Sequence, residues 1–247
     1  MTEESPRSEF KSQRSHFSFK MKCNEIVKQL ESLSSPENRQ GMARFGINIE
    51  KAYGVSVADL RKLARKIKHN HLLAQQLWSS EMHEARILAS MVDKPELVTE
   101  KQIEQWAKDF NSWDLTDQCC LNLFSKTKFA YKKCFELSIR KEEFVKRTAF
   151  ALMACLSWQN KQMPDSKFEK FFPIIIREAT DERNFVKKAV NWALRQIGKR
   201  NISLNKKAIA AAKKIEKIDD KTAKWIAKDA LKELTSVSVQ KRLSDAH

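Results

Sequence analysis

Glycine and proline are scarce in this chain, with 4 glycines and 5 prolines among 247 residues. Antiparallel β-sandwiches and barrels need frequent turn residues, so this scarcity argues against both classes. The glycines fit neither the G-x-G-x-x-G spacing nor the P-loop spacing of phosphate-binding loops; they are Gly41, Gly46, Gly54 and Gly198. We therefore expect neither a dehydrogenase nor a nucleotide-driven motor, and no nucleotide partner.

Cysteine spacings that hold metals are missing as well. The five cysteines contain no C-x-x-C motif and their number is odd, so neither a zinc knuckle nor an iron–sulfur loop is supported. Cys119, Cys134 and Cys155 lie among apolar residues with helical spacing, and we expect them to be buried as small apolar side chains. We predict no metal site and no cofactor. Reduced thiols are consistent with the cytoplasm.

Long apolar segments are also absent. The N-terminus has no apolar stretch of the signal-peptide kind, and no apolar run approaches the length that crosses a bilayer. The sequence therefore predicts a soluble intracellular protein with no membrane partner.

Positive charge, in contrast, is abundant. Lysine and arginine number 47 and aspartate and glutamate 31, which gives a net charge of +16. On a folded chain such an excess favours a polyanionic partner, most often nucleic acid. A general solubility charge, or contact with a ribosome or a membrane surface, is the alternative.

Two short segments nearly repeat each other forty-one residues apart. Phe144–Ala149 reads FVKRTA, and Phe185–Val190 reads FVKKAV. Each opens a segment with helical periodicity. A period near forty residues made of helix pairs is typical of HEAT-like solenoids, whose units complete each other's core. The predicted fold class is all-α: a HEAT-like α-α superhelix with a basic concave face.

The chain reads as one helical domain between two tails. Residues 1–19 are polar and basic and are predicted to be a flexible tail, residues 20–236 form the repeat domain, and residues 237–247 form a C-terminal tail. Apolar periodicity predicts helices at 26–33, 60–67, 72–78, 85–91, 103–110, 113–124, 129–139, 144–158, 168–179, 184–197, 205–215 and 221–234. Ser56 is expected to cap one helix, and Pro173 is expected to start or kink another.

The last predicted helix has a stripe of lysines along one face. Lys221, Lys224, Lys228 and Lys232 recur at helical spacing. The stripe either lies along phosphates or is a solvated face, and the sequence leaves both interpretations open.

The most unusual segment is Asn111–Gln118, which reads NSWDLTDQ. Trp113 and Asp117 are four residues apart and share a helix face, with Asp114 close by. Carboxylates on a DNA-binding face repel phosphates, so we expect them to have another purpose. The alternative is that Trp113 belongs to the core and the aspartates only charge the first helical turn, where Ser112 is a candidate cap.

Two further residues in the repeated segments are candidates for the same site. Arg147 is able either to pair with Asp117 across neighbouring helices, as a purely structural ion pair, or to hold a phosphate. Trp192 lies at the edge of its helix's apolar stripe, so its spacing slightly favours packing and leaves exposure open.

These segments resemble the AlkD-like DNA alkylation repair proteins, which are HEAT-like-repeat DNA glycosylases. The similar segments cover residues 22 to about 235 in order, and they are Met42–Phe45, Gly54–Val55, Leu60–Arg61, Ser112–Asp117, Arg147 with the alanine-rich helix after it, and Phe185–Arg195. The chain departs from the pattern at Ser112, where the family has an aromatic residue.

The resemblance implies an enzyme that removes N3- and N7-alkylated purines from duplex DNA, without swinging the base into a pocket. It implies that Asp117, Trp113 and Trp192 are catalytic and that Arg147 holds the neighbouring phosphate. We predict DNA contacts for Arg147, Asp114, Lys146, Lys187, Lys188 and Arg195. The expected partner is duplex DNA containing alkylated purines, and we expect a cytoplasmic, nucleoid-associated monomer.

Three rival functions follow from the same residues. A non-catalytic member of this fold would bind damaged or branched DNA without releasing bases. A protein–protein scaffold is a common use of helical solenoids. A helix-hairpin-helix glycosylase is disfavoured because its hairpin requires glycine.

Overall fold

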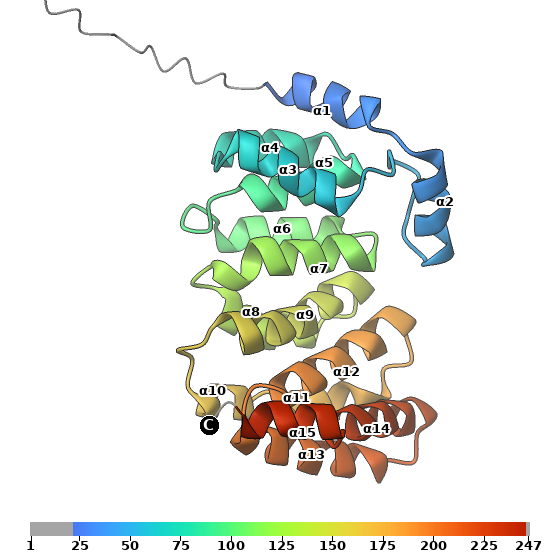
Figure 1. Ribbon diagram of the computed structural model, residues 1–247, viewed down its shortest axis with the longest axis vertical. Helices are drawn as coiled ribbons and strands as arrows, with labels where there is room; N and C mark the ends of the chain where they lie inside the picture. The colour runs from blue at the N-terminus through green and yellow to red at the C-terminus, as the bar shows by residue number, and fades with distance from the viewer. Residues whose placement is uncertain (1–21, 246–247) are drawn as a thin grey trace, which may run out of the picture.

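The computed structural model describes residues 22–245, and Figure 1 shows them as a stack of helices that runs from the N-terminal to the C-terminal end. Fifteen α-helices and two 3-10 turns account for all of the regular structure in these residues, and they contain no β-strand. The predicted all-α class is therefore confirmed. Within the same residues, no helix is both long enough and apolar enough to span a membrane.

The helices form two layers. The first layer packs each member against the next along the stack, and it consists of α5 (His83–Val92), α7 (Trp113–Asn122), α9 (Glu143–Gln159), α12 (Asn184–Gly198) and α14 (Lys221–Leu234). The second layer consists of α4 (His71–Ser79), α6 (Glu100–Asp109), α8 (Ala130–Ser138), α10 (Asp165–Glu169), α11 (Phe172–Arg177) and α13 (Ile202–Glu216). Helices α4, α8 and α13 each cover a first-layer helix, so the two layers enclose one elongated core.

The remaining elements lie at the two ends or join the layers. They are α1 (Cys23–Ser32), α2 (Pro36–Arg44), α3 (Val57–Ile67), α15 (Val237–Ser244), and the 3-10 turns η1 (Phe124–Lys126) and η2 (Glu178–Thr180). Helix α2 contains no buried residue and stands beside the main stack in Figure 1. This position makes α2 a wall next to the first layer.

The repeated segments occupy equivalent positions in neighbouring units. Phe144 is the second residue of α9 and Phe185 the second residue of α12. Their rings stack with centroids 5.6 Å apart and an interplanar angle of 30°. The sequence repeat therefore corresponds to a structural repeat, in which each unit contributes to the core of the next.

Large apolar side chains fill the core as the periodicity predicts. Trp78 of α4 and Trp106 of α6 stack with ring centroids 3.8 Å apart and with nearly parallel planes. Cys119, Cys134 and Cys155 are fully buried, which confirms that prediction. Burial raises the pKa of all three thiols, so they remain protonated and act as small apolar groups.

A buried carboxylate fixes the loop between α2 and α3. The side chain of Glu84 accepts hydrogen bonds from the backbone nitrogens of Tyr53, Gly54 and Val55, at 2.9, 2.6 and 3.3 Å. Gly54 has a φ of +83°, and a Cβ at this position would overlap the carbonyl oxygen of Ser35. Because several N–H groups satisfy the buried charge, Glu84 holds α2 and its loop against α5.

Most helix boundaries agree with the predicted ones. Ser56 caps α3 by accepting a hydrogen bond from the Asp59 nitrogen at 3.2 Å. Pro173 lies in the first turn of α11, as expected. The single helix predicted at 168–179 is divided into α10, α11 and η2, because the chain breaks just before this proline.

Two elements differ from the expectation. Helix α2 was not predicted, because its sequence has little apolar content. The C-terminal segment predicted as a tail from residue 237 contains α15, which Ser236 caps. The tail predicted at residues 1–19 lies outside the described residues.

Candidate functional site

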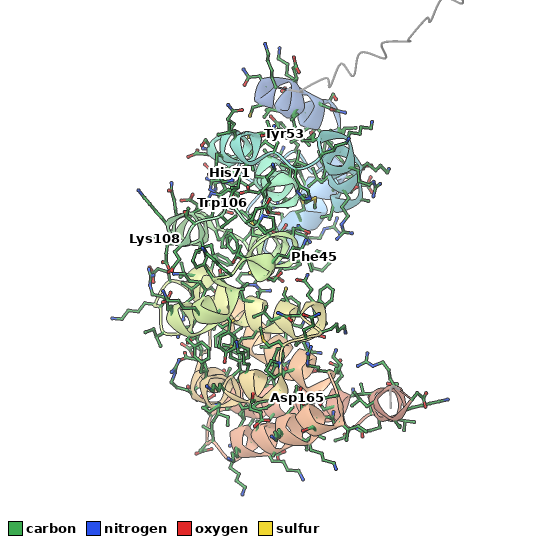
Figure 2. The ribbon with its side chains drawn as sticks, turned by 90° about the vertical axis from the view of Figure 1, so that its left-hand side faces the viewer. Phe45, Tyr53, His71, Trp106, Lys108 and Asp165 are labelled. Carbon is green, nitrogen blue, oxygen red and sulfur yellow. The ribbon has the colours of Figure 1, made fainter. Side chains whose placement is uncertain are left out.

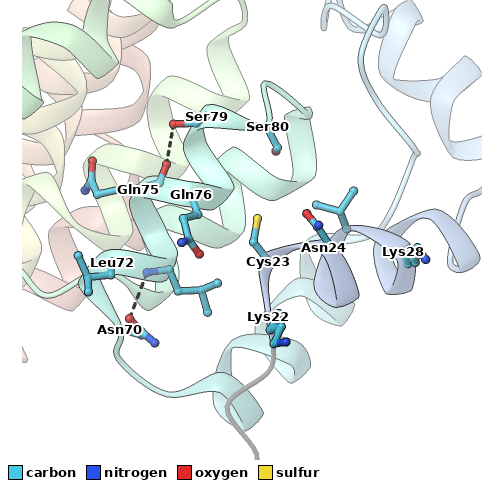
Figure 3. Close-up of a pocket in the computed structure, with 12 residues that line it drawn as sticks. Lys22, Cys23, Asn24, Lys28, Asn70, Leu72, Gln75, Gln76, Ser79 and Ser80 are labelled. Carbon is cyan, nitrogen blue, oxygen red and sulfur yellow. Dashed lines mark hydrogen bonds between the residues drawn. The ribbon is translucent and has the colours of Figure 1, made fainter.

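A large cleft lies away from the predicted site. It measures about 1210 Å³ and lies between α1 and α4, where Figure 3 shows mainly polar side chains. Some of these are already engaged locally: Ser79 Oγ donates to the Gln75 carbonyl, and Asn70 caps α4 through the Leu73 nitrogen. No candidate catalytic residue lines this cleft, and we assign it no function.

A second cleft, of about 730 Å³, gathers four of the predicted site residues. Trp113, Asp114 and Asp117 of α7 line it together with Trp192 of α12. Leu121 of α7 also lines it, and its other walls come from α2 and its loop, α3, α5 and α9, and they include Met42, Phe45, Ile47, Val57, His83 and Trp158. The cleft is thus aromatic and mostly apolar, with carboxylates from a single helix on one side.

The α2 loop holds the first tryptophan in place. Trp113 is the first residue of α7 and is only partly buried. Its Nε1 donates a hydrogen bond of 3.0 Å to the carbonyl oxygen of Phe45, sixty-eight residues earlier in the chain. This hydrogen bond fixes the Nε1 edge of the indole, while Trp113 still lines the cleft.

Arg147 binds Asp117 with two parallel hydrogen bonds. The Nε–Oδ1 distance is 3.0 Å and the Nη2–Oδ2 distance is 2.8 Å, while Nη1 donates to the Phe185 carbonyl at 2.5 Å. The guanidinium also lies 5.9 Å from the ring centre of Trp113. Only 6% of the Arg147 side chain is exposed, against 20% of Asp117. The first interpretation of Arg147, a pair with Asp117 across neighbouring helices, is therefore observed; its contact with a phosphate stays a prediction.

The electrostatics of Asp117 reflect two opposing effects. Burial raises the pKa of this carboxyl above its ordinary value overall, and the Arg147 guanidinium opposes that rise. The bidentate geometry is that of an ionised carboxylate, which accepts from both arms of the guanidinium. A carboxylate that is negative but shielded from bulk water is suited to stabilise a nearby positive charge.

Asp114 has a different partner on α5. Its Oδ2 lies 2.8 Å from Nε2 of His83, whose side chain is 5% exposed. Burial raises the pKa of Asp114, but the hydrogen bond and the charge of His83 lower it below the ordinary value overall. Burial likewise lowers the pKa of His83, and the Asp114 carboxylate raises it above 6.5 overall. This pair joins α5 to the first turn of α7 and so positions Trp113.

Ser112 occupies the N-cap position of α7, but its hydroxyl makes no capping hydrogen bond. The residue is fully buried, so a larger aromatic side chain at this position would have to displace the core. The departure from the family pattern at Ser112 therefore lies behind the cleft wall and not on it.

The predicted DNA-binding lysines and arginines have different surroundings. Lys146 is largely buried between Glu178 and Asp181, at 2.6 and 3.2 Å. Arg195 pairs with Glu233 of α14. Lys188 is exposed, and Lys187 is partly buried. The exposed Lys188 has the freest surroundings for a phosphate contact.

Sequence reasoning missed most of the other residues that line the cleft, among them Phe45, Trp158 and His83. Phe45 is 72% exposed and Trp158 is 44% exposed, although both are large and apolar. Figure 2 shows Phe45 projecting from the edge of the N-terminal half. His83 lines the same cleft and is buried. The only signal for Trp158 was an aromatic residue at the polar end of a long apolar helix, and nothing linked Phe45 to Trp113.

Ligands for a metal do not gather in this cleft. In residues 22–245, no group of three or more histidine, cysteine, aspartate or glutamate side chains is placed to hold an ion. Indoles and carboxylates line the cleft, and a guanidinium is bound to one of the carboxylates.

The fold and this cleft together define a HEAT-like helical-repeat protein of the DNA alkylation repair class. The family described as DNA alkylation repair enzyme matches residues 26–234. The chain belongs to that family. Its predicted resemblance is therefore confirmed.

A solved structure supports the fold independently. It is described as belonging to a new family of proteins related to the HEAT-like repeat DNA glycosylases, with affinity for branched DNA structures. The TM-score is 0.72 and the sequence identity 18%, and the match covers 85% of this chain and 94% of the other. At this identity the likeness establishes the architecture alone. Comparison with curated proteins gives no match.

Proposed function

We propose that this protein hydrolyses the N-glycosidic bond of N3- and N7-alkylated purines in duplex DNA. One observation carries the proposal: Trp113, Asp117 and Trp192, from two non-adjacent helices of the first layer, line one cleft, with Arg147 bound to the carboxylate. Membership of the DNA alkylation repair enzyme family supports the same class of reaction.

The substrate supplies part of the driving force. An N7-alkylated purine carries a positive charge, and breaking the bond between C1′ and N9 sends the electron pair to N9, which neutralises the base. The positive charge moves to the sugar, in a transition state resembling an oxocarbenium ion. Water then adds to C1′ and releases its proton, leaving an abasic site.

The cleft residues are suited to this charge shift. The faces of Trp113 and Trp192 stabilise a cationic sugar through the ring quadrupole, by about 0.5–2 kcal/mol per contact. Asp117 adds a fixed negative charge and orients the attacking water. Arg147 keeps this carboxylate ionised and aimed, because it holds both oxygens.

The test is incubation of the purified protein with methylated DNA, followed by chromatography of the released bases. Asp117→Asn should lower release of N7-methylguanine by at least about a hundredfold, the usual effect of removing a charge-stabilising group. Trp192→Ala should lower it by about two- to thirtyfold, the equivalent of one cation–π contact. Glu216→Gln, an exposed carboxylate on α13, is the matched control and should keep full activity. Absence of base release by the wild-type protein would end the glycosylase proposal.

A second function, DNA binding without catalysis, has its own supporting observation. Both oxygens of Asp117 are already bound by Arg147, as in a purely structural ion pair. The structural neighbour is itself described by its affinity for branched DNA. This alternative gives salt-dependent DNA binding and no released base, so the same chromatogram separates the two.

A further inference from the structure

One tryptophan has no place in the core or in the cleft. The chain has six tryptophans. The other five are Trp78 and Trp106 in the core, and Trp113, Trp158 and Trp192 in the cleft. Trp225 lies on α14 and is 42% exposed. Exposing an indole to water forgoes the free energy of burying it, so its place on this surface needs an explanation.

A regular set of contacts between α12 and α14 fixes the position of Trp225. Three cross-helix pairs follow each other along the two helices, each thirty-eight residues apart in sequence: Lys187 with Trp225, Asn191 with Asp229, and Arg195 with Glu233. The Lys187 ammonium lies 5.7 Å from the centre of the indole ring. The indole therefore lies at the junction of the two helices, with a cation beside it.

Lysines surround this indole along the exposed face of α14. Lys221, Trp225, Lys228 and Lys232 recur at positions i, i+4, i+7 and i+11, and all four are exposed. The opposite face is buried through residues such as Ile226 and Ala230. The lysine stripe is therefore on the solvent side of the last first-layer helix.

The charges of this stripe are not cancelled by the acidic residues close to it. Asp229 accepts from Asn191, and Glu233 accepts from Arg195 and Lys199. Asp219 pairs with Lys224, the one lysine of α14 that has a carboxylate partner in residues 22–245. Lys221, Lys228 and Lys232 therefore keep their charge for an external partner.

We propose that the α12–α14 surface binds a single-stranded DNA segment, with phosphates on the lysines and an unpaired base stacked on Trp225. This surface is defined by Lys187, Lys188, Lys221, Trp225, Lys228 and Lys232. An aromatic ring held in a basic groove is the usual platform for single strands, because every base offers a π-face. In a duplex those faces are buried in the base stack, so a duplex would contact the lysines through its phosphates and would not stack on the indole. An acidic peptide would likewise use the lysines without needing a stacking partner.

The first test compares two undamaged DNA probes, a blunt duplex and the same duplex with a single-stranded thymidine tail of about ten nucleotides, a length within the usual site sizes. The wild-type protein should bind the tailed probe about tenfold more tightly, since one base–aromatic stack has roughly that effect. Trp225→Ala should remove this advantage while changing the affinity for the blunt duplex less than about twofold. Trp225→Phe, which keeps a stacking ring, should retain most of it.

The second test measures the charge contribution with a matched pair of variants. Lys221→Ala combined with Lys228→Ala should change how the binding constant for the isolated thymidine strand depends on salt. The slope of log K against log salt concentration should become shallower by about 1.4, the value for two phosphates on a single strand. Lys213→Ala combined with Lys214→Ala removes two exposed lysines from α13 in the second layer and should leave the slope unchanged.

Either of two results would overturn this proposal: equal wild-type affinity for both probes, or a Trp225→Ala variant that keeps the tail preference. Thermal unfolding of each variant separates loss of binding from loss of fold. The probes contain no alkylated base, so the outcome does not depend on the proposed glycosylase activity, and failure of one leaves the other standing.

Discussion

Asp117 and Arg147 form a bidentate ion pair across the interface between α7 and α9, and the same guanidinium continues to the Phe185 carbonyl at the start of α12. One side chain thereby joins three successive first-layer helices. The carboxylate that we propose for catalysis is thus also a joint between repeats. Stability and activity are expected to be coupled at this residue.

Replacement of Arg147 tests this coupling. Arg147→Met should lower the free energy of unfolding by about 3 kcal/mol, because it leaves a buried carboxylate without its partner. The Asp117→Asn, Arg147→Met double variant should recover part of this loss, as no unpaired charge remains. Urea unfolding followed by circular dichroism measures both values. Additive losses in the double variant would show that the two residues do not act as a pair.

The pair of His83 and Asp114 predicts a pH dependence of stability. The folded-state pKa of His83 is raised, so its contribution is fully present below about pH 6.5, the ordinary value, and is lost as the pH rises through the raised value. The folded-state pKa of Asp114 is lowered, so its contribution is lost as the pH falls through that lower value.

Unfolding free energies measured across this range should therefore fall on both sides of a plateau. His83→Gln should flatten the alkaline side and lower the plateau. A His83→Gln profile that merely shifts down in parallel with the wild type would contradict the assignment.

Two glycines of the α2 region offer a matched comparison. Gly54→Ala should destabilise the protein by more than about 1 kcal/mol, because its φ is +83° and a Cβ would overlap the Ser35 carbonyl. Gly41→Ala, in the middle of α2 with no atom within 4 Å of the added carbon, should instead stabilise it by about 0.5–1 kcal/mol.

Melting temperatures of the two variants give the sign of each effect. A destabilised Gly54→Ala protein should also release bases more slowly, since the same loop holds Trp113 through Phe45. Equal melting temperatures for the two variants would show that the loop tolerates a side chain.

Trp158 is expected to contribute to substrate binding and little to the stability of the fold. Trp158→Ala should change the unfolding free energy little, since the side chain is 44% exposed, and should weaken binding of alkylated duplex by about 1 kcal/mol, near fivefold. Leu72→Ala, an exposed apolar residue beside the other cleft, is the control. Competition binding with and without methylation measures the difference; equal effects of the two changes would remove Trp158 from the site.

Much of this architecture was predictable because it depends on local spacing. The apolar period identified the helices of both layers, and the echo of Phe144 in Phe185 identified the repeat. The spacing of Trp113 and Asp117 placed them on one helix face, which the structure confirms. Such inferences need only the geometry of a single helix and the recurrence of its pattern.

The remaining parts of the site depend on contacts between distant segments. The loop after α2 reaches Trp113 over sixty-eight residues, and His83 meets Asp114 over thirty-one. Helix α2 has no apolar stripe, so periodicity could not reveal it, and its position depends on the buried carboxylate of Glu84. Local spacing in a single sequence does not predict which polar side chain binds which backbone amide in a distant segment.

The cleft has a further property because its walls belong to separate repeats. Trp113 and Trp192 are carried by α7 and α12, with α9 packed between them. The distance between the two indoles therefore depends on how α9 packs against α7 and against α12. A substitution that alters the packing of α9 against either neighbour is therefore expected to change the spacing of these rings.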